Sequence, residues 1–250
     1  MSNQLLVNVD NHRSRQRIKE LGEVFTPDVY VKQMLNQLDP KLWSNEAAVF
    51  FEPTCGHGNF VTAILERRIN GLSQKYLKER PTDHRLAALA NALATLWAID
   101  IDATNIHLTR TRVAHRALLS FGPIGSRPGK KLLNYLSHVI CTIHWQIHEN
   151  ETLSSLSDDS NAMTIASQTI IGEEWLSVHR HKPIDFEMNW CEFYSTSKER
   201  GVEPLLFQRA SSFIQSIFQG NSKRANDFSF AKDSLQALLK DKKVVLGGVT

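Results

Sequence analysis

The chain has 250 residues, of which 42% are hydrophobic and 22% charged, which is enough for one sizeable hydrophobic core. This composition excludes a collagen-like, coiled-coil or wholly disordered chain. The formal net charge of +3 is too small to identify a nucleic-acid-binding protein by bulk charge, so that assignment requires local patches or motifs.

No stretch of the sequence approaches the roughly 18 consecutive apolar residues that a membrane-spanning helix requires, and the first residues show no signal-peptide pattern. We therefore expect a soluble, cytoplasmic protein with no membrane partner. The three cysteines are odd in number and lack CxxC spacing, which predicts free thiols at Cys55, Cys141 and Cys191.

The domain organisation is simple, since no internal repeat and no clear boundary divides the sequence. Residues 1–22 are polar and basic, which predicts an arm or a short surface helix. We expect residues 23–250 to form a single domain, although the pattern of elements is weaker after residue 150.

The first well-defined element is a helix that starts at Thr26. Thr26 supplies a capping hydroxyl, Pro27 suits the first turn, and Asp28 lies near the positive end of the helix dipole. Asp39 and Pro40 end the helix. One face carries its apolar residues, Val31, Met34, Leu35 and Leu38.

Strands and helices then alternate. A buried strand at 47–51 passes through a glycine turn into a helix that begins near residue 60, and two further helices are broken near Pro81. A second buried strand at 98–101 is followed by a helix at 103–119. This alternation predicts an α/β fold with a mostly parallel sheet flanked by helices, because parallel neighbours need a crossover connection.

The rest of the chain gives weaker signals. Possible strands lie at 143–148, 163–171 and 184–194, and helical patterns return at 205–218 and 230–239. The last residues, VVLGGVT, form either a final strand or a frayed end.

Two acidic residues and two glycines mark a candidate ligand site. Glu52 ends the first strand, Gly56 and Gly58 permit a tight turn with exposed amides, and Asp100 closes the second strand. The carboxyl ends of the strands in an α/β sheet border one crevice, so both acids should point into it. An acid at the end of the second strand commonly accepts hydrogen bonds from a ribose diol.

A nicotinamide dinucleotide site or a purely structural corner is the alternative interpretation of this turn. A dinucleotide site normally places its ribose acid about 20 residues beyond the glycines, whereas Asp100 follows Gly58 at roughly twice that separation. Asp102, which precedes a helical run, is expected to cap the following helix.

Three motifs together resemble a known family. They are GEVFTP at positions 22–27, EPTCGHGNF at 52–60 and AIDID at 98–102. In this order they resemble the S-adenosylmethionine-dependent, adenine-specific DNA methyltransferases of restriction-modification systems. The resemblance implies a class I, Rossmann-like methyltransferase fold and S-adenosylmethionine as the cofactor.

The resemblance also implies which residues bind the methionine part of that cofactor. Phe25, Thr26 and Pro27 would lie near it, and Glu52 would face its ammonium group. The glycine loop would wrap around it with Pro53, Cys55, Gly56, Gly58 and Phe60.

The nucleoside part has a second set of implied contacts. Asp100 would hold the ribose and Ile101 would pack on the adenine. The family also places an acid after a third strand to bind the adenine amino group, and Glu151 is the candidate here. A surface acid in a loop is the alternative interpretation of Glu151.

The catalytic motif departs from the family. Adenine-amino methyltransferases use an Asn or Asp, two prolines and an aromatic residue, which bind the target amino group and stack on a flipped base. None of the eight prolines here is adjacent to another. The nearest equivalent is Asn189 followed by Trp190, where the amide and the indole would take those two catalytic roles.

These observations favour a DNA adenine methyltransferase of a restriction-modification or phage-defence system. Two alternatives remain open. One is a catalytically degenerate methyltransferase-fold subunit that binds cofactor or a partner without methyl transfer, and the other is a methyltransferase for RNA, protein or a small molecule. DNA is the expected partner, with sequence specificity supplied by another subunit.

Basic segments could contact DNA phosphates at 13–19, at 127–131 and in the lysine-rich tail. The histidines do not predict a metal site. His144 and His148 would share a helix face, and His179 and His181 a strand face, but no carboxylate follows at ligand spacing. His57 is interpreted as a variable position of the glycine loop.

Overall fold

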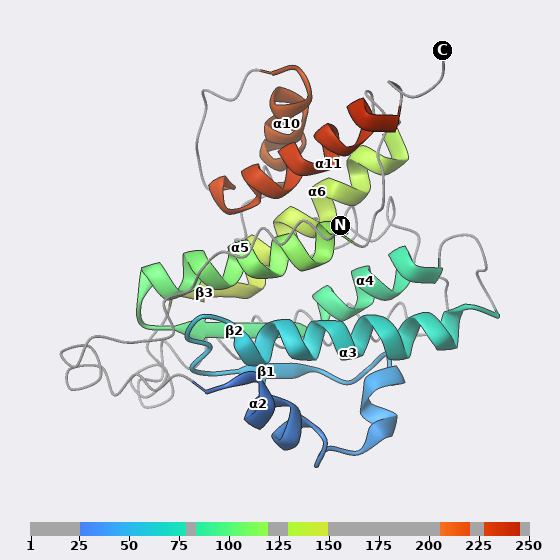
Figure 1. Ribbon diagram of the computed structural model, residues 1–250, viewed down its shortest axis with the longest axis vertical. Coiled ribbons are helices and arrows are strands. Elements are labelled where there is room, and N and C mark those ends of the chain that lie inside the picture. Colours follow the sequence, from blue (N-terminus) through green and yellow to red (C-terminus); the bar gives the residue numbers. More distant parts are fainter. Residues whose placement is uncertain (1–25, 79–83, 120–129, 150–205, 221–227, 246–250) are drawn as a thin grey trace, which may run out of the picture.

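The computed structural model describes residues 26–78, 84–119, 130–149, 206–220 and 228–245 (Figure 1). Within these ranges three parallel strands form an open sheet in the order β1-β2-β3. The strands are β1 (Phe50–Glu52), β2 (Leu96–Asp100) and β3 (Ile147–Glu149). The predicted α/β class, with a parallel sheet flanked by helices, is confirmed for this part of the chain.

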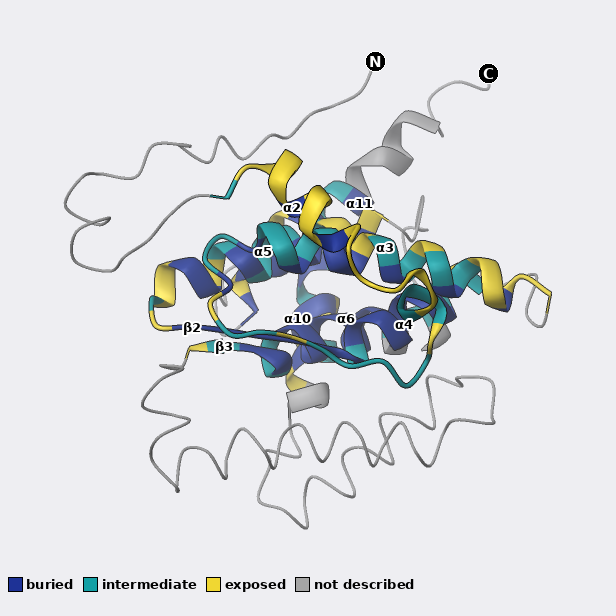
Figure 2. Cartoon of the chain, turned by 90° about the horizontal axis from the view of Figure 1, so that it is seen from below, coloured by how far each residue is buried: buried dark blue, intermediate teal, exposed yellow. Residues whose placement is uncertain are grey.

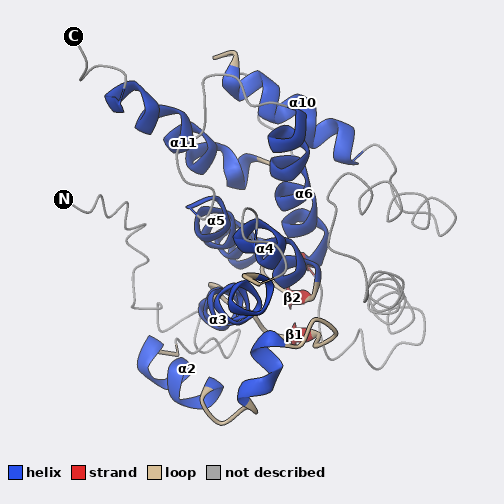
Figure 3. Cartoon of the chain, turned by 90° about the vertical axis from the view of Figure 1, so that its right-hand side faces the viewer, coloured by secondary structure: helices blue, strands red, loops and turns tan. Residues whose placement is uncertain are grey.

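Helices fill both crossovers between the strands, as parallel neighbours require. The first crossover contains α3 (Asn59–Tyr76) and α4 (His84–Ala94), and the second contains α5 (Ala103–Leu119) and α6 (Lys130–Gln146). Helices α3 and α5 lie side by side on one face of the sheet (Figure 3). The chain passes almost directly from α4 into β2 and from α6 into β3.

The remaining elements pack around this unit. Helix α2 lies against α3, α10 lies against α6, and α11 lies against α5. Two short 3-10 helices precede β1 and α11. The bounds of these elements are α2 (Asp28–Leu35), η1 (Pro40–Ser44), α10 (Leu206–Phe218), η2 (Ser229–Ala231) and α11 (Lys232–Val245).

The core lies between the helices and the sheet (Figure 2). All five residues of β2 are buried, because β1 and β3 flank this strand on both sides. Strand β1 has one described neighbour, and Phe51 on it is 43% exposed. One continuous apolar cluster joins the helices to the sheet through residues such as Leu65, Leu89, Leu136 and Ile140.

The strand–glycine turn–helix unit and the helix at 103–119 are confirmed. Both predicted strands are shifted. The first begins at Phe50 instead of residue 47, because the amides of Ala47 and Ala48 are bound by the side chain and carbonyl of Asn45 in a turn. The second runs from Leu96 to Asp100, so Ile101 lies beyond the strand.

The predicted strand at 143–148 is wrong over most of its length. Helix α6 continues to Gln146 and only the last residues join the sheet as β3. Arg110 stabilises this junction, since its guanidinium donates to the carbonyls of His144 and Ile147 at 2.8 and 2.6 Å. His144 and His148 therefore do not share a helix face.

Two terminal predictions also need correction. The helix predicted at 230–239 begins with η2 and continues as α11 to Val245, so the first two valines of VVLGGVT are helical and do not start a strand. The predicted helix at 205–218 is confirmed as α10. The possible strands at 163–171 and 184–194 lie outside the described residues.

Helix α2 is shorter than predicted and begins differently. The N-cap is Pro27, whose carbonyl accepts hydrogen bonds from the amides of Tyr30 and Val31, so Thr26 provides no side-chain cap. The helix ends at Leu35, well before Asp39, which instead caps η1. Of the predicted apolar face, Val31 and Leu35 are buried, whereas Met34 and Leu38 are 54% and 39% exposed.

In the part of the chain that the structure describes, none of the helices is both long enough and apolar enough to cross a membrane. Cys55 and Cys141 are buried free thiols, as predicted, and Cys191 lies outside the described residues.

A fully buried arginine connects the first crossover to the segment before β1. Arg68 on α3 donates to the carbonyls of Leu42 and Asn45 at 2.9 and 2.6 Å. Its other terminal nitrogen donates to Asn91 and Thr95 at the end of α4, at 3.1 Å each. Burial lowers the pKa of Arg68 to about 10, and the guanidinium is held by neutral acceptors.

Replacing this guanidinium should destabilise the fold. Arg68→Met leaves several buried carbonyl and side-chain acceptors without a donor, so we expect a loss of about 2–5 kcal/mol in the free energy of unfolding, measured by urea denaturation. The control is Arg116→Gln, which removes a partly exposed ion pair with Glu66 and should cost less than about 1 kcal/mol. Equal effects of the two substitutions would contradict the role assigned to Arg68.

A buried histidine should make stability depend on pH. His138 on α6 is fully enclosed, and burial lowers its pKa from 6.5 to about 3 despite an opposing contribution from the backbone of Ala90. Between these two values the unfolded chain binds the proton and the folded chain does not, so stability falls as the pH drops below 6.5.

Lowering the pH from 7 to 5.5 should therefore reduce the free energy of unfolding by about 1 kcal/mol through His138 alone. His138→Gln should remove this part of the pH dependence in denaturation curves recorded across that range. Parallel curves for the two proteins would show that His138 does not titrate in this way.

Candidate functional site

The three described strands end in acidic residues at the same edge of the sheet. Glu52 ends β1, Asp100 ends β2 and Glu149 ends β3, and all three arrowheads point the same way in Figure 1. Asp100 and Glu149 are register partners. This edge therefore carries three carboxylates, of which Asp100 is buried and Glu149 exposed.

Sequence reasoning missed Glu149. It selected Glu151, which follows the expected third strand and lies outside the described residues. Glu149 is identified by its position as the last residue of β3, where it pairs in register with Asp100. This register exists only once the strands pair.

The glycine loop closes over the end of β2. The amide of Cys55 donates to the Ile99 carbonyl at 2.9 Å, and the amide of Gly56 donates to Asp100 Oδ2 at 2.8 Å. Gly56 and Gly58 have φ values of 50° and 79°, in the left-handed region that favours glycine. Gly58 is also the N-cap of α3.

Polar side chains of α5 hold this loop in place. Asn105 Nδ2 donates to Asp100 Oδ1 at 3.0 Å, Thr109 Oγ1 donates to the Gly56 carbonyl at 2.8 Å, and Arg112 donates to the His57 carbonyl at 2.6 Å. The spacing of these three residues places them on one face of the helix. The sequence signal for this face is the spacing of polar residues along one side of α5.

Asp100 gives most of its hydrogen-bonding capacity to the protein. Oδ1 accepts from the amide of Asp102 at 2.9 Å and from Asn105, and Oδ2 accepts from Gly56. A carboxylate offers about four acceptor positions, so about one remains for a ligand. Asp102 caps α5 through the amide of Thr104 at 2.7 Å, which confirms its predicted structural role.

Glu52, unlike Asp100, makes only weak hydrogen bonds within the described part of the protein. Its Oε1 accepts weak hydrogen bonds from the amide and hydroxyl of Thr54, at 3.3 and 3.4 Å. Burial raises the pKa of Glu52, and the two bonds from Thr54 oppose that rise only in part. Among the described residues no Lys, Arg or His forms an ion pair with Glu52, so this partly desolvated carboxylate favours a cationic ligand.

Cys55 lies near both carboxylates but has no chemistry of its own at neutral pH. Burial, together with the charges of Asp100 and Glu52, raises the pKa of its thiol to about 12. The thiol is therefore protonated and a poor nucleophile. That both carboxylates act on the same sulfur is a second indication that they converge at this edge of the sheet.

The other residues implied by the resemblance differ in burial, and some lie outside the described residues. The Thr26 carbonyl, next to Pro27, accepts a hydrogen bond from Asn59 at 2.9 Å. Pro53 and Phe60 are half-buried, with Phe60 packed against the core, and Ile101 is 55% exposed just beyond Asp100. Phe25, Glu151, Asn189 and Trp190 lie outside the described residues.

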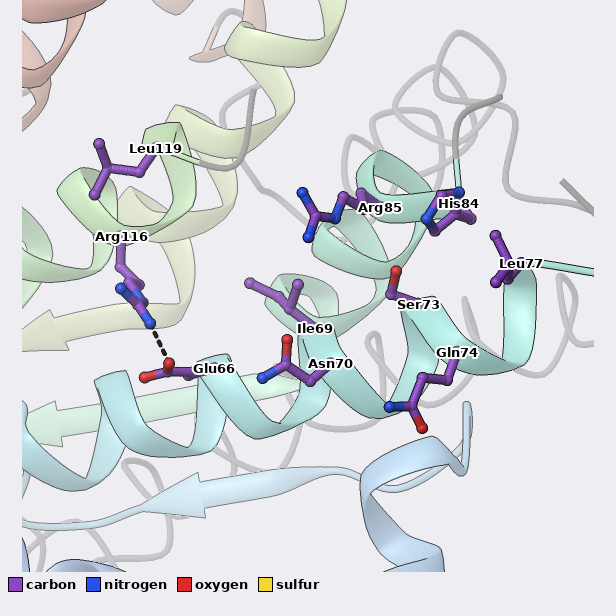
Figure 4. A pocket seen from close by; sticks show the side chains of 10 residues that line it. All are labelled: Glu66, Ile69, Asn70, Ser73, Gln74, Leu77, His84, Arg85, Arg116 and Leu119. Atoms are coloured by element: carbon purple, nitrogen blue, oxygen red, sulfur yellow. Dashed lines mark ion pairs between the residues drawn. The ribbon is translucent and has the colours of Figure 1, made fainter. Parts of the chain in front are cut away.

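A separate open groove of about 580 Å³ lies along the second half of α3, away from the glycine loop (Figure 4). The Arg116–Glu66 ion pair crosses one end of it and His84 and Arg85 border the other. No residue implied in cofactor binding lines this groove. The described residues also contain no group of three His, Cys, Asp or Glu side chains able to hold a metal ion.

The site thus combines a rigid loop with left-handed glycines, a buried acid bound to that loop and a second acid that lacks a described cation. This arrangement suits a ligand with a positive charge and hydroxyl groups. Comparisons with protein-family models, curated proteins and solved structures find no match for this chain.

The two loop glycines should differ in their tolerance of a side chain. A Cβ on Gly58 would lie 2.8 Å from Thr109 Cγ2, whereas a Cβ on Gly56 meets no atom within 4 Å. Gly56→Ala should therefore cost about 1–2 kcal/mol of stability from backbone strain alone. Gly58→Ala adds a steric clash, and we expect about 2–4 kcal/mol in urea denaturation.

Thr109→Ala tests the clash directly, since it removes both Cγ2 and Oγ1, which would lie 2.8 and 2.9 Å from the added Cβ. It also removes the hydrogen bond to the Gly56 carbonyl, so the cost of Gly58→Ala is measured within each background. That cost should be smaller in the Thr109→Ala background than in wild type, and an equal cost in both would mean that it does not come from these two atoms.

Proposed function

We propose that this chain is a class I, Rossmann-like methyltransferase that binds S-adenosylmethionine at the carboxyl edge of its sheet and methylates the exocyclic amino group of DNA adenine. The observation that carries the proposal is Glu52, a partly desolvated carboxylate with no cationic partner among the described residues. S-Adenosylmethionine carries an ammonium and a sulfonium group, which would supply that charge.

The residues present fit this cofactor. Glu52 would bind the ammonium group, and the loop at Gly56 would border the methionine part. Asp100 would accept a ribose hydroxyl at its remaining acceptor position, since the loop already occupies the others. Ile101 and Glu149, at the ends of neighbouring segments, are exposed and available to contact the adenine.

The cofactor supplies a methyl group on a positively charged sulfur when bound. The task of the chain is then to orient the acceptor amino group and to exclude water from it. Asn189 would accept a hydrogen bond from the adenine amino group, and Trp190 would stack on the flipped base. DNA phosphates would be bound by the basic segments at 13–19 and 127–131.

The absence of adjacent prolines favours a second candidate function. A catalytically degenerate subunit of a restriction-modification or phage-defence complex would keep the cofactor site and lose transfer chemistry. Incubation of the purified chain with tritiated S-adenosylmethionine and DNA, RNA or protein acceptors separates the two. Label in DNA adenine supports the methyltransferase, tight cofactor binding without transfer supports the degenerate subunit, and label in another acceptor overturns the assignment to DNA.

Glu52→Gln tests the cofactor site with little change of shape. The amide oxygen can still accept from Thr54, but the negative charge is lost, so affinity for S-adenosylmethionine should fall by about 1–3 kcal/mol in calorimetric titration. The matched control is Glu66→Gln, which removes the same charge at the groove on α3 and should leave the affinity unchanged. Wild-type affinity in the Glu52 variant would remove this residue from the site.

A further inference from the structure

Asn59, the first residue of α3, links three segments around the glycine loop. Its Nδ2 donates to the carbonyl of Thr26 at 2.9 Å, and its Oδ1 accepts from Arg112 Nη1 at 2.6 Å. The same Arg112 nitrogen donates to the carbonyl of His57 at 2.6 Å. A continuous chain of hydrogen bonds therefore joins the segment before α2, the glycine loop and α5.

Electrostatics support the same connection. Arg112 on α5 is partly buried, and burial lowers its pKa. The charge of Asp28, the first residue of α2, opposes that change and favours the cation. The amino end of α2 is thus linked to Arg112 by hydrogen bonds through Asn59 and by the electrostatic attraction of Asp28.

The apolar contact of α2 is too small to fix its position alone. Only Val31 and Leu35 of this helix are buried, whereas Val29 and Tyr30 are each 56% exposed. Burying two side chains contributes a few kcal/mol at most, and apolar contact is not directional. Polar anchors must therefore determine where the amino end of α2 lies.

A second anchor holds the other end of α2. Arg67, further along α3, donates to the carbonyl of Lys32 at 3.1 Å and to Asn36 Oδ1 at 2.8 Å. Neither contact of this anchor involves the glycine loop. The two anchors come from the same helix and differ mainly in whether they touch the candidate site, so each serves as a control for the other.

We propose that Asn59 and Arg112 are positioning residues that hold the backbone at Thr26 and Pro27 against the glycine loop and so cover the methionine end of the bound cofactor. The second half of this inference rests on the proposed function. Neither residue needs to touch the cofactor, since a cover displaced by about 1 Å is enough to weaken binding or catalysis.

Asn59→Asp removes one of the two side-chain hydrogen bonds of Asn59 and keeps the other. An aspartate still accepts from Arg112 but has no N–H for the carbonyl of Thr26. In hydrogen–deuterium exchange of the ligand-free protein, the amides of residues 29–31 should exchange about tenfold faster, while those of α4 and α5 are unchanged. Affinity for S-adenosylmethionine should fall by about tenfold for the same reason.

Arg67→Gln is the matched control. It releases the other end of α2, so the amides near Asn36 should exchange faster while cofactor affinity stays within about twofold of wild type. An equal loss of affinity in both variants would mean that any loosening of α2 is sufficient, and would overturn the specific role of Asn59.

Arg112 gives a second test if Asn59→Asp fails to fold. Arg112→Gln should accelerate exchange at residues 29–31 and weaken cofactor binding, and Arg112→Lys, which keeps the charge near Asp28, should recover part of both. If Arg112→Lys loses as much cofactor affinity as Arg112→Gln, the positioning role of Arg112 is overturned.

The outcomes distinguish this inference from the proposed function. Exchange of α2 in the ligand-free protein tests the anchor without any cofactor, and unchanged exchange in Asn59→Asp overturns it. If the wild-type chain does not bind S-adenosylmethionine, the proposed function fails and the cofactor-covering role fails with it, whatever the exchange shows. If wild type binds and the variant binds equally well despite faster exchange, only the covering role is overturned.

Discussion

The hydrogen bond from the Gly56 amide to the Asp100 carboxylate is the interaction on which the rest of this edge of the sheet depends. It joins the loop after β1 to the end of β2, two segments that are distant in sequence and adjacent in the parallel sheet. The bond requires the left-handed backbone at Gly56 and a carboxylate kept in place by Asn105. Because Asp100 is buried, its loss would leave the loop amide without its acceptor and would remove one partner of Asn105.

Helix α5 organises the site although none of its residues belongs to a recognised motif. Its side chains hold Asp100, the Gly56 carbonyl and the His57 carbonyl on one face, and Arg110 on the same helix ties the end of α6 to β3. The second crossover is therefore more than a connection between strands. Its side chains set the position of the glycine loop on one side and of Glu149 on the other. In this way a fold with short strands can hold its carboxylates in fixed positions.

The electrostatics of this edge are unusual because Glu52 and Asp100 form no ion pair with a described cation, whereas the charge of Glu149 interacts with Arg110. Asp100 is compensated by neutral donors, and Glu52 only partly by Thr54. A structural corner of an α/β sheet has no need for such a carboxylate, since an apolar or amide side chain would cost less to bury. The positively charged ligand that we propose would provide a physical reason to keep it, and this would link the geometry to the cofactor that the motifs predict.

The sequence by itself determined the local features of this protein: the strand–glycine turn–helix unit, the helix at 103–119 and the Asp102 cap. Each depends on periodicity or turn chemistry within a few residues, which propensity and capping rules describe well. It also predicted that Glu52 and Asp100 lie at the same edge of the sheet, because parallel strands end at one edge. Only the tertiary structure decided that residues 143–146 are helical, that Glu149 ends the third strand, and that α5 and Asn59 hold the loop and α2 together. These features depend on strand register and on packing between distant segments, where the interactions that choose one conformation come from residues far away in the chain.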